Sequence, residues 1–256
     1  MDTAAYLARI GLCETEQIQS LALLRRLQSN HILHIPYENL DILEGIPLSL
    51  DRESLFEKLV VRRRGGYCFE LNAAFAGLLC ALGFSVKSYL ARFLKGETEI
   101  PVRRHRVVVA ECEGKRYLLE VGIGQNAPRY PLLLEEGIVQ EGGTERYRFH
   151  KEPFLGWVLC QEHEGAWRPY FSFTEEEQLE IDFTHPSFFC EKHPSSPFNK
   201  DVMVSIKTPT GRKAINGRVY KVFEGDMAVS VEEGISDERL YELLQSEFGI
   251  TWKKQH

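Results

Sequence analysis

One segment of the chain joins a glycine pair to a cysteine and to a helix that is apolar on all sides. The run RRRGGYCFELN occupies residues 62–72, and apolar residues continue on every face as far as Leu82. A helix without a polar face is buried inside a domain, and adjacent glycines interrupt the helix before them. The sequence therefore predicts a central, buried helix over residues 68–82, ended by Gly83 and carrying Cys68 at its first turn.

The place of Cys68 at a helix start favours covalent chemistry. The N-terminal end of a helix carries a partial positive charge, which lowers the pKa of a thiol below its free value of about 8.5. Most cysteines are only buried apolar residues. The glycine pair and the helix start distinguish Cys68 from the other five, which are Cys13, Cys80, Cys112, Cys160 and Cys190. Because the six are scattered over 256 residues, we expect free thiols in the cytoplasm and no disulfide framework.

The rest of the pattern predicts an α+β fold. Two earlier helices are expected, one capped by Thr15 and ending near Asn30, the other capped by Asp51. Ser236 caps a closing helix. Strands are expected over residues 85–93, 105–111, 116–121, 146–159, 202–206, 218–223 and 227–231. Helices come first and strands follow, without the alternation of a parallel α/β sheet.

A nucleophilic cysteine needs a base, and the base needs a group that orients it. Residues 113–114 read as a two-residue hairpin turn, which would pair Val107 with Glu120 and place His105 diagonal to Glu120 on the same face. A three-residue loop would put the two on opposite faces. Since a buried carboxylate requires a partner, we expect Glu120 to orient His105 toward Cys68.

Two other motifs are weaker. Residues 122–127 fit a G-x-G-x-x-A phosphate-binding fingerprint, but Pro128 and Pro131 stand where its helix should begin. Two Cys-x-x-His pairs, at residues 160–163 and 190–193, fit no compact zinc-binding pattern. We expect neither a dinucleotide nor a metal.

Net charge and apolar runs limit the class of partner. The chain has 31 basic and 37 acidic residues and a net charge of −6, whereas nucleic-acid-binding domains usually carry a basic excess. Residues 1–6 lack the features of a secretory signal, and no apolar run approaches the ~18 residues of a membrane span. We therefore expect no nucleic-acid partner and no membrane association.

Taken together, these segments resemble the arylamine N-acetyltransferases over nearly the whole chain. The matching segments are residues 6–11, 35–40, 64–72, 105–107, 121–124, 193–198 and 208–212. The R-G-G-x-C-F-E-x-N run is the most specific of them. The resemblance implies a helical bundle over residues 1–84, an antiparallel β-barrel over 85–190 and an α/β lid over 191–256, around a cysteine-proteinase-like catalytic core.

The resemblance also implies a Cys-His-Asp triad and a ping-pong reaction through an acetyl-cysteine. Acetyl-CoA would be the cosubstrate, with arylamines, hydrazines or arylhydroxylamines as acceptors and no metal. Cys68 and His105 match the family, but Glu120 stands where the family has aspartate. Tyr37, Phe93 and Phe198 correspond to acceptor-pocket positions. Gly124, Ser195, Ser196 and Thr208 correspond to the region that meets coenzyme A.

Two alternatives stay open. A cysteine hydrolase or transglutaminase-like enzyme shares the chain order of cysteine, histidine and acid. The other alternative is a catalytically weakened relic that only binds coenzyme A. It would apply if glutamate cannot replace the aspartate.

Overall fold

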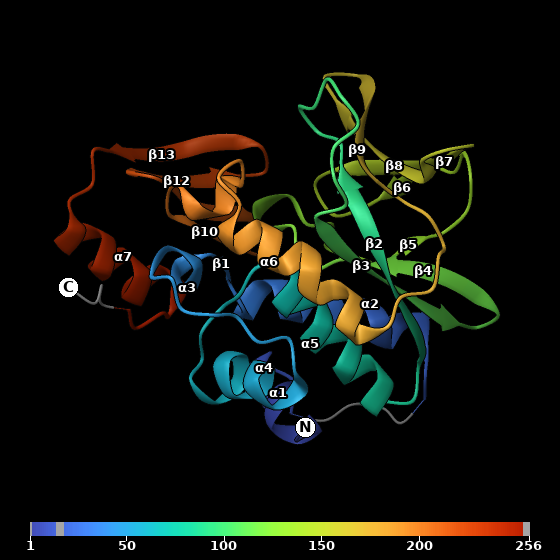
Figure 1. Ribbon diagram of the computed structural model, residues 1–256, viewed down its shortest axis with the longest axis horizontal. Helices are drawn as coiled ribbons and strands as arrows, with labels where there is room; N and C mark the ends of the chain where they lie inside the picture. Colours follow the sequence, from blue (N-terminus) through green and yellow to red (C-terminus); the bar gives the residue numbers. More distant parts are fainter. Residues whose placement is uncertain (1, 14–17, 253–256) are drawn as a thin grey trace.

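The computed structural model describes residues 2–13 and 18–252 and is an α+β protein, as predicted (Figure 1). Helices come first, a barrel of eight strands follows, and a second sheet with a closing helix completes the chain. Within the two described ranges, no helix combines the length and the apolar character that crossing a bilayer requires.

The N-terminal helices pack around a central one. In chain order they are α1 (Thr3–Arg9), α2 (Leu21–His34), α3 (Leu40–Leu43), α4 (Arg52–Phe56), the π-helical turn η1 (Glu57–Val61) and α5 (Cys68–Ala81). Helix α5 lies between the other helices and the barrel (Figure 1) and is buried along most of its length. Its predicted bounds are confirmed to within one residue. Gly83 follows with a φ of +87°, which only glycine adopts without strain.

The prediction for α2 differs from the structure at both ends. Thr15, the expected cap, lies outside the described residues, and Ser20 caps the helix instead. The helix passes Asn30 and continues to His34. It stops there because Pro36 keeps the residue before it out of helical conformation. The predicted cap of α4 by Asp51 is confirmed.

The eight-stranded sheet forms a nearly closed antiparallel barrel. Its strands are β2 (Ser85–Phe93), β3 (His105–Cys112), β4 (Lys115–Leu119), β5 (Leu132–Leu133), β6 (Gln140–Glu141), β7 (Arg146–Glu152), β8 (Gly156–His163) and β9 (Ala166–Phe173). The spatial order is β5-β4-β3-β2-β9-β8-β7-β6. The Gln140 amide joins the two edge strands, since it accepts from the Leu133 backbone N–H and donates to its carbonyl.

Two barrel strands differ from the sequence prediction. The expected strand over residues 146–159 is a hairpin of β7 and β8, with its turn at residues 153–155. Strand β9 was not predicted, because Pro169 removes a ladder donor and disfavours a strand. In the structure Pro169 pairs with Cys160 beside a register shift between β8 and β9, where a proline is tolerated.

The second sheet has five strands in the order β1-β10-β11-β12-β13. They are β1 (Tyr37–Glu38), β10 (Met203–Lys207), β11 (Gly211–Asn216), β12 (Val219–Glu224) and β13 (Met227–Glu233). Helix α7 (Asp237–Phe248) packs on this sheet, capped by Ser236 and ended by Gly249 as predicted. Strand β11 was not predicted.

Short helices connect these layers. They are η2 (Gly124–Asn126), η3 (Glu180–Phe183), α6 (Thr184–Lys192) and η4 (Pro197–Asn199). Helix α6 crosses over α5 (Figure 1), and β1 from the N-terminal segment pairs with β10 from the C-terminal one. The division at residues 84/85 and 190/191 stays a proposal.

Candidate active site

The glycine pair before α5 allows two backbone segments to pass very close together. The Gly66 carbonyl accepts from the Glu38 amide at 2.9 Å, and the Gly66 amide donates to the Pro36 carbonyl at 3.3 Å. A Cβ at Gly65 would stand 2.2 Å from that same Pro36 oxygen. Any larger residue at Gly65 would therefore push the loop away and displace Cys68.

Buried ion pairs fix the position of the start of α5. Lys58 lies 2.8 Å from both Asp41 and Glu70, and Arg64 lies 2.7 Å from Glu38 and 2.9 Å from Asp41. Glu70 also accepts from a backbone amide at the helix start. The three carboxylates therefore meet two cations, and this network fixes the helix end that carries the cysteine.

The environment of Cys68 differs in one respect from the sequence prediction. Its side chain is buried, and burial raises the pKa of the thiol well above its ordinary value, with the neighbouring Cys190 thiol and the Glu120 carboxylate acting in the same direction. Backbone amides of Phe69 and Arg106 lower the pKa, but desolvation outweighs them. The expected lowering at the helix start is thus wrong for the thiol alone. A thiolate needs a base that takes the proton inside the site.

The predicted hairpin at residues 113–114 is confirmed, and it brings His105 and Glu120 together. Glu113 and Gly114 have φ values of +53° and +71°, which is typical of a two-residue turn, and the ladder runs to Val108 opposite Leu119. The next positions are Val107 and Glu120, as predicted. His105 and Glu120 thus share a face, and His105 Nε2 lies 2.8 Å from Glu120 Oε2.

A cavity of about 230 Å³ opens at Cys68 and His105. The three predicted acceptor residues all line it: Tyr37, Phe93 and Phe198. Among the described residues, its lining also includes Gly122 and Asn126 from the turn after β4, and Ser205 from β10. The cavity therefore brings a thiol and an imidazole together beside three aromatic side chains.

The four residues predicted to meet coenzyme A are not in that described lining: Gly124, Ser195, Ser196 and Thr208. Ser196 is buried and donates to the Cys190 carbonyl, while Ser195 contacts His193. Thr208 accepts from the Gly211 amide through its hydroxyl. Their role toward coenzyme A stays a prediction.

Comparison with known proteins decides the family. The sequence model of the N-acetyltransferase family matches residues 20–256. The chain belongs to the arylamine N-acetyltransferase family. It is 33% identical to the Escherichia coli arylamine N-acetyltransferase, over 96% of this chain and 87% of that protein. It is 36% identical to the Mycolicibacterium smegmatis enzyme, over 85% and 81% of the two chains.

Solved structures of the family share the fold. The arylamine N-acetyltransferase from Salmonella typhimurium superposes with a TM-score of 0.94 at 31% identity, covering 98% of this chain and 92% of that one. The Mycobacterium marinum arylamine N-acetyltransferase, solved in complex with CoA, gives a TM-score of 0.91 at 31% identity, with 98% and 93% covered.

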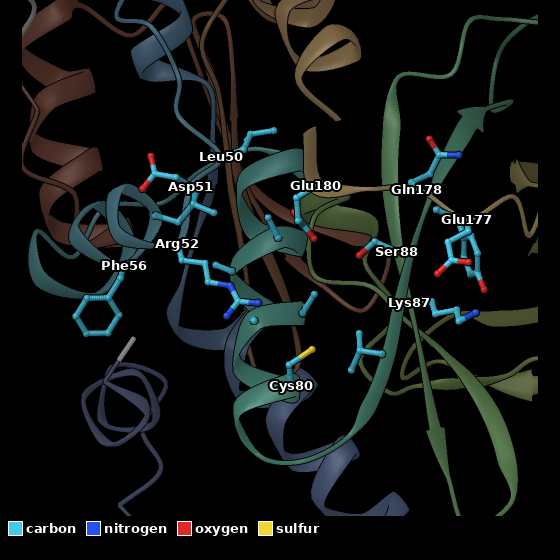
Figure 2. Close-up of a pocket in the computed structure, with 17 residues that line it drawn as sticks. Leu50, Asp51, Arg52, Phe56, Cys80, Lys87, Ser88, Glu177, Gln178 and Glu180 are labelled. Atoms are coloured by element: carbon cyan, nitrogen blue, oxygen red, sulfur yellow. The ribbon is translucent and has the colours of Figure 1, made fainter. Parts of the chain in front are cut away.

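A second cavity, of about 260 Å³, lies on another side of α5, between this helix, α4 and β2 (Figure 2). Its charged and thiol-bearing residues include Arg52, Lys87, Glu180 and Cys80. No histidine lines this second cavity in the described part of the chain. It therefore offers a thiol but no histidine beside it, whereas the cavity at Cys68 has both.

No group of three or more histidine, cysteine, aspartate or glutamate side chains is placed to hold a metal ion among residues 2–13 and 18–252.

Asn72 is a residue of this site to which the sequence analysis gave no role. It follows Cys68 by one helical turn and donates to Glu120 Oε1 at 2.9 Å and to the Arg106 carbonyl at 2.6 Å. Its own oxygen accepts from the Val121 amide at 3.1 Å. The spacing of four residues from Cys68 was the available signal. Asn72 thus connects α5 to β3 and to the segment that directly follows β4.

Asn72→Ala is expected to lower the free energy of unfolding by about 2–4 kcal/mol, because buried hydrogen-bonding groups lose their partner. Asn30→Ala is the matched control, since Asn30 donates one exposed hydrogen bond to Arg26 and its loss should cost about 0.5 kcal/mol or less. Urea unfolding of both variants measures the difference. Equal stabilities would show that the three contacts of Asn72 contribute nothing.

Proposed function

We propose that the protein transfers the acetyl group of acetyl-CoA to arylamines, hydrazines or arylhydroxylamines through an acetyl-Cys68 intermediate. The observation that carries this proposal is the hydrogen bond between His105 and Glu120 at the wall of the cavity that also contains Cys68. The family supports the choice of reaction, and a relative was solved with CoA.

In the first half-reaction, His105 acts as the base. Its Nε2–H donates to Glu120, so the other ring nitrogen keeps its lone pair and accepts the thiol proton. The Cys68 sulfur attacks the thioester carbonyl, the bond to the CoA sulfur breaks, and the imidazolium returns its proton to the leaving thiolate. The acetyl group stays on Cys68.

In the second half-reaction, the acceptor amine occupies the aromatic cavity. Arylamines are weakly basic and neutral at pH 7, so their nitrogen is free to attack the acetyl-Cys68 carbonyl. His105 accepts the amine proton and returns it to the Cys68 sulfur as the amide leaves. Tyr37, Phe93 and Phe198 would hold the aromatic ring and limit the entry of water.

The Glu120 carboxylate is fully occupied by hydrogen-bond partners. This carboxylate is fully buried, and Oε1 accepts from the Gly122 amide at 2.6 Å and from Asn72, while Oε2 meets His105. The Gly122 backbone also passes close to the start of α5. A Cβ at Gly122 would stand 2.8 Å from the Cys68 Cα atom, so this position needs a glycine. We propose that Glu120 orients His105 in this chain.

Coenzyme A would approach from the side of the second sheet. The Gly124, Ser195, Ser196 and Thr208 regions would meet it, as the family resemblance implies. A Cβ at Gly124 would stand 2.8 Å from the Ser205 hydroxyl and 3.0 Å from the Tyr37 ring. The turn therefore packs tightly against Ser205 and Tyr37, two residues of the cavity lining. We also propose that the protein is located in the cytoplasm.

Acetyl-CoA alone, without an acceptor, tests the function. We expect a burst of one equivalent of free CoA and a mass gain of about 42 Da on Cys68, the covalent intermediate of a ping-pong transferase. Cys68→Ser should abolish both, and Cys80→Ser, at an exposed cysteine in the second cavity, should retain both.

The alternatives give different results in the same experiment. A cysteine hydrolase or transglutaminase-like enzyme would give no acetyl adduct and would release ammonia or amine from a peptide amide. A relic would bind CoA but leave Cys68 unmodified. Either result would overturn the proposed transfer.

A further inference from the structure

The nucleophile has a second thiol beside it that the acetyl-transfer mechanism does not use. The Cys68 sulfur lies 3.9 Å from the Arg104 carbonyl oxygen, and the Cys190 sulfur lies 3.8 Å from the same oxygen. Both residues belong to one buried cluster. Two thiols that share one carbonyl oxygen are neighbours in space, although they are far apart in the chain.

The packing of α6 on the start of α5 explains this juxtaposition. Tyr67, the residue before Cys68, makes a 2.5 Å hydroxyl contact with Ser187. Ser187 lies three residues before Cys190 on α6, so Cys190 occupies the same helix face one turn on. The rings of Phe69 and Phe183 are 6.3 Å apart and extend the same contact. The crossing of α6 over α5 (Figure 1) therefore brings Cys190 near the start of α5, where both sulfurs approach the Arg104 carbonyl.

The surroundings distinguish the two thiols in reactivity. Cys190 is fully buried, and burial raises its pKa to about 12, so it stays protonated and out of reach of dissolved oxidants. Cys68 opens into the cavity beside His105. An oxidant that enters would therefore meet Cys68 first, because the thiolate is the reactive form.

We propose that Cys190 is a resolving thiol for oxidised Cys68, so that the active site forms a reversible Cys68–Cys190 disulfide when it encounters a peroxide. The proposal rests on the nucleophilic Cys68 of the proposed function but does not require acetyl transfer. Of the other four cysteines, Cys13 and Cys80 are exposed, and Cys112 and Cys160 lie outside the buried cluster that holds Cys68 and Cys190.

The chemistry balances in two steps. The Cys68 thiolate attacks one peroxide oxygen, the O–O bond breaks, and the leaving hydroxide takes the proton held by His105 and departs as water. The Cys190 sulfur then attacks the sulfur of Cys68–SOH while its thiol proton passes to the departing oxygen, so that the S–S bond forms as the S–O bond breaks. The thiol proton leaves with the hydroxide as a second water. The two sulfurs lose two electrons, which reduce the peroxide.

A resolving thiol would protect Cys68 from irreversible oxidation. A sulfenic acid that meets more peroxide becomes a sulfinic acid, which ordinary thiols do not reduce. A neighbouring thiol competes with that reaction at an effective concentration far above that of any dissolved species. The disulfide would thus store Cys68 in a form that a dithiol reductant returns to the active state.

Peroxide treatment of the full chain, read by intact mass and peptide mapping, tests the proposal. Native protein should become about 2 Da lighter and yield a peptide linking Cys68 to Cys190. Dithiothreitol should restore the original mass and the activity. Cys190→Ala and Cys190→Ser should instead gain about 32 Da as Cys68 sulfinic acid and should not recover. Cys112→Ala, the same change at a buried cysteine of the β3–β4 hairpin, should behave as native protein.

Mass separates this proposal from the proposed function, because the linked peptide is detected whether or not the enzyme acetylates. Each variant's activity is compared with its own unoxidised sample. Native protein that gains oxygen on Cys68 without the linked peptide would overturn the proposal, as would a disulfide formed only between two chains.

Discussion

Replacing His105 by glutamine is expected to lower the rate of Cys68 acetylation by about 10⁴-fold, because the base and the means of ionising the nucleophile are lost together. Burial raises the pKa of the Cys68 thiol well above its ordinary value. Ionised sulfur is therefore scarce at neutral pH unless a nearby group accepts its proton. Rapid-quench measurement of CoA release in the first turnover checks the expected loss.

The same variant should change how Cys68 alkylation depends on pH. In the native enzyme the proton moves to the imidazole, so the rate with iodoacetamide should stay nearly constant around neutral pH. In H105Q the thiol titrates alone. Because its pKa is raised, the thiolate fraction at pH 7 is smaller than in a free thiol, and the rate should climb about tenfold per pH unit past pH ~8.5.

A histidine elsewhere on the barrel provides the matched control. His150 also has a carboxylate partner, with Nε2 3.0 Å from Glu152, but it is partly exposed and is not in the described lining of the Cys68 cavity. His150→Gln should leave acetylation and the alkylation profile at native values. If H105Q itself kept the native rate and profile, Cys68 would need no base and the proposed mechanism would fail.

The parts of the site that could be predicted are those fixed by local rules. The turn at residues 113–114 sets the register of β3 and β4, and register alone places His105 and Glu120 on one face. The glycine pair and the apolar run likewise fix where α5 begins, and with it Cys68. These predictions needed no knowledge of distant contacts.

The parts that could not be predicted depend on distant segments. The pKa of Cys68 is set by burial under α6 and the barrel, which outweighs the helix end that the sequence makes visible. Asn72 gains its role only because two strands pass beside α5. Strand β9 was missed because Pro169 is tolerated at a register shift that no local pattern reveals.

The proposed role of Glu120 in orienting His105 leads to the second large effect. Glu120→Gln should lower turnover by about 10³- to 10⁴-fold, as expected when a histidine loses the acid that fixes its tautomer. Two donors, the Gly122 amide and the Asn72 side chain, already face Oε1. A glutamine must therefore place its oxygen there and turn its NH₂ group toward His105.

That orientation reverses the hydrogen bond. His105 Nε2 would have to accept, so the proton would move to the nitrogen that should receive the Cys68 proton, and the base would be blocked. Glu120→Asp is the matched control, because it keeps the charge and shortens the side chain by one methylene. A displacement of about 1 Å costs on the order of 100-fold, so the aspartate variant should lie between native enzyme and E120Q.

Steady-state kinetics with an arylamine acceptor and urea unfolding of the three proteins separate catalysis from stability. The three rates should fall in the order native, E120D, E120Q, while the folded fraction at the assay temperature stays the same. Near-native turnover in E120Q would show that Glu120 does not orient His105. A stable E120D as slow as E120Q would show that reach matters as much as charge, because the 2.8 Å contact between His105 and Glu120 requires the longer side chain on this backbone.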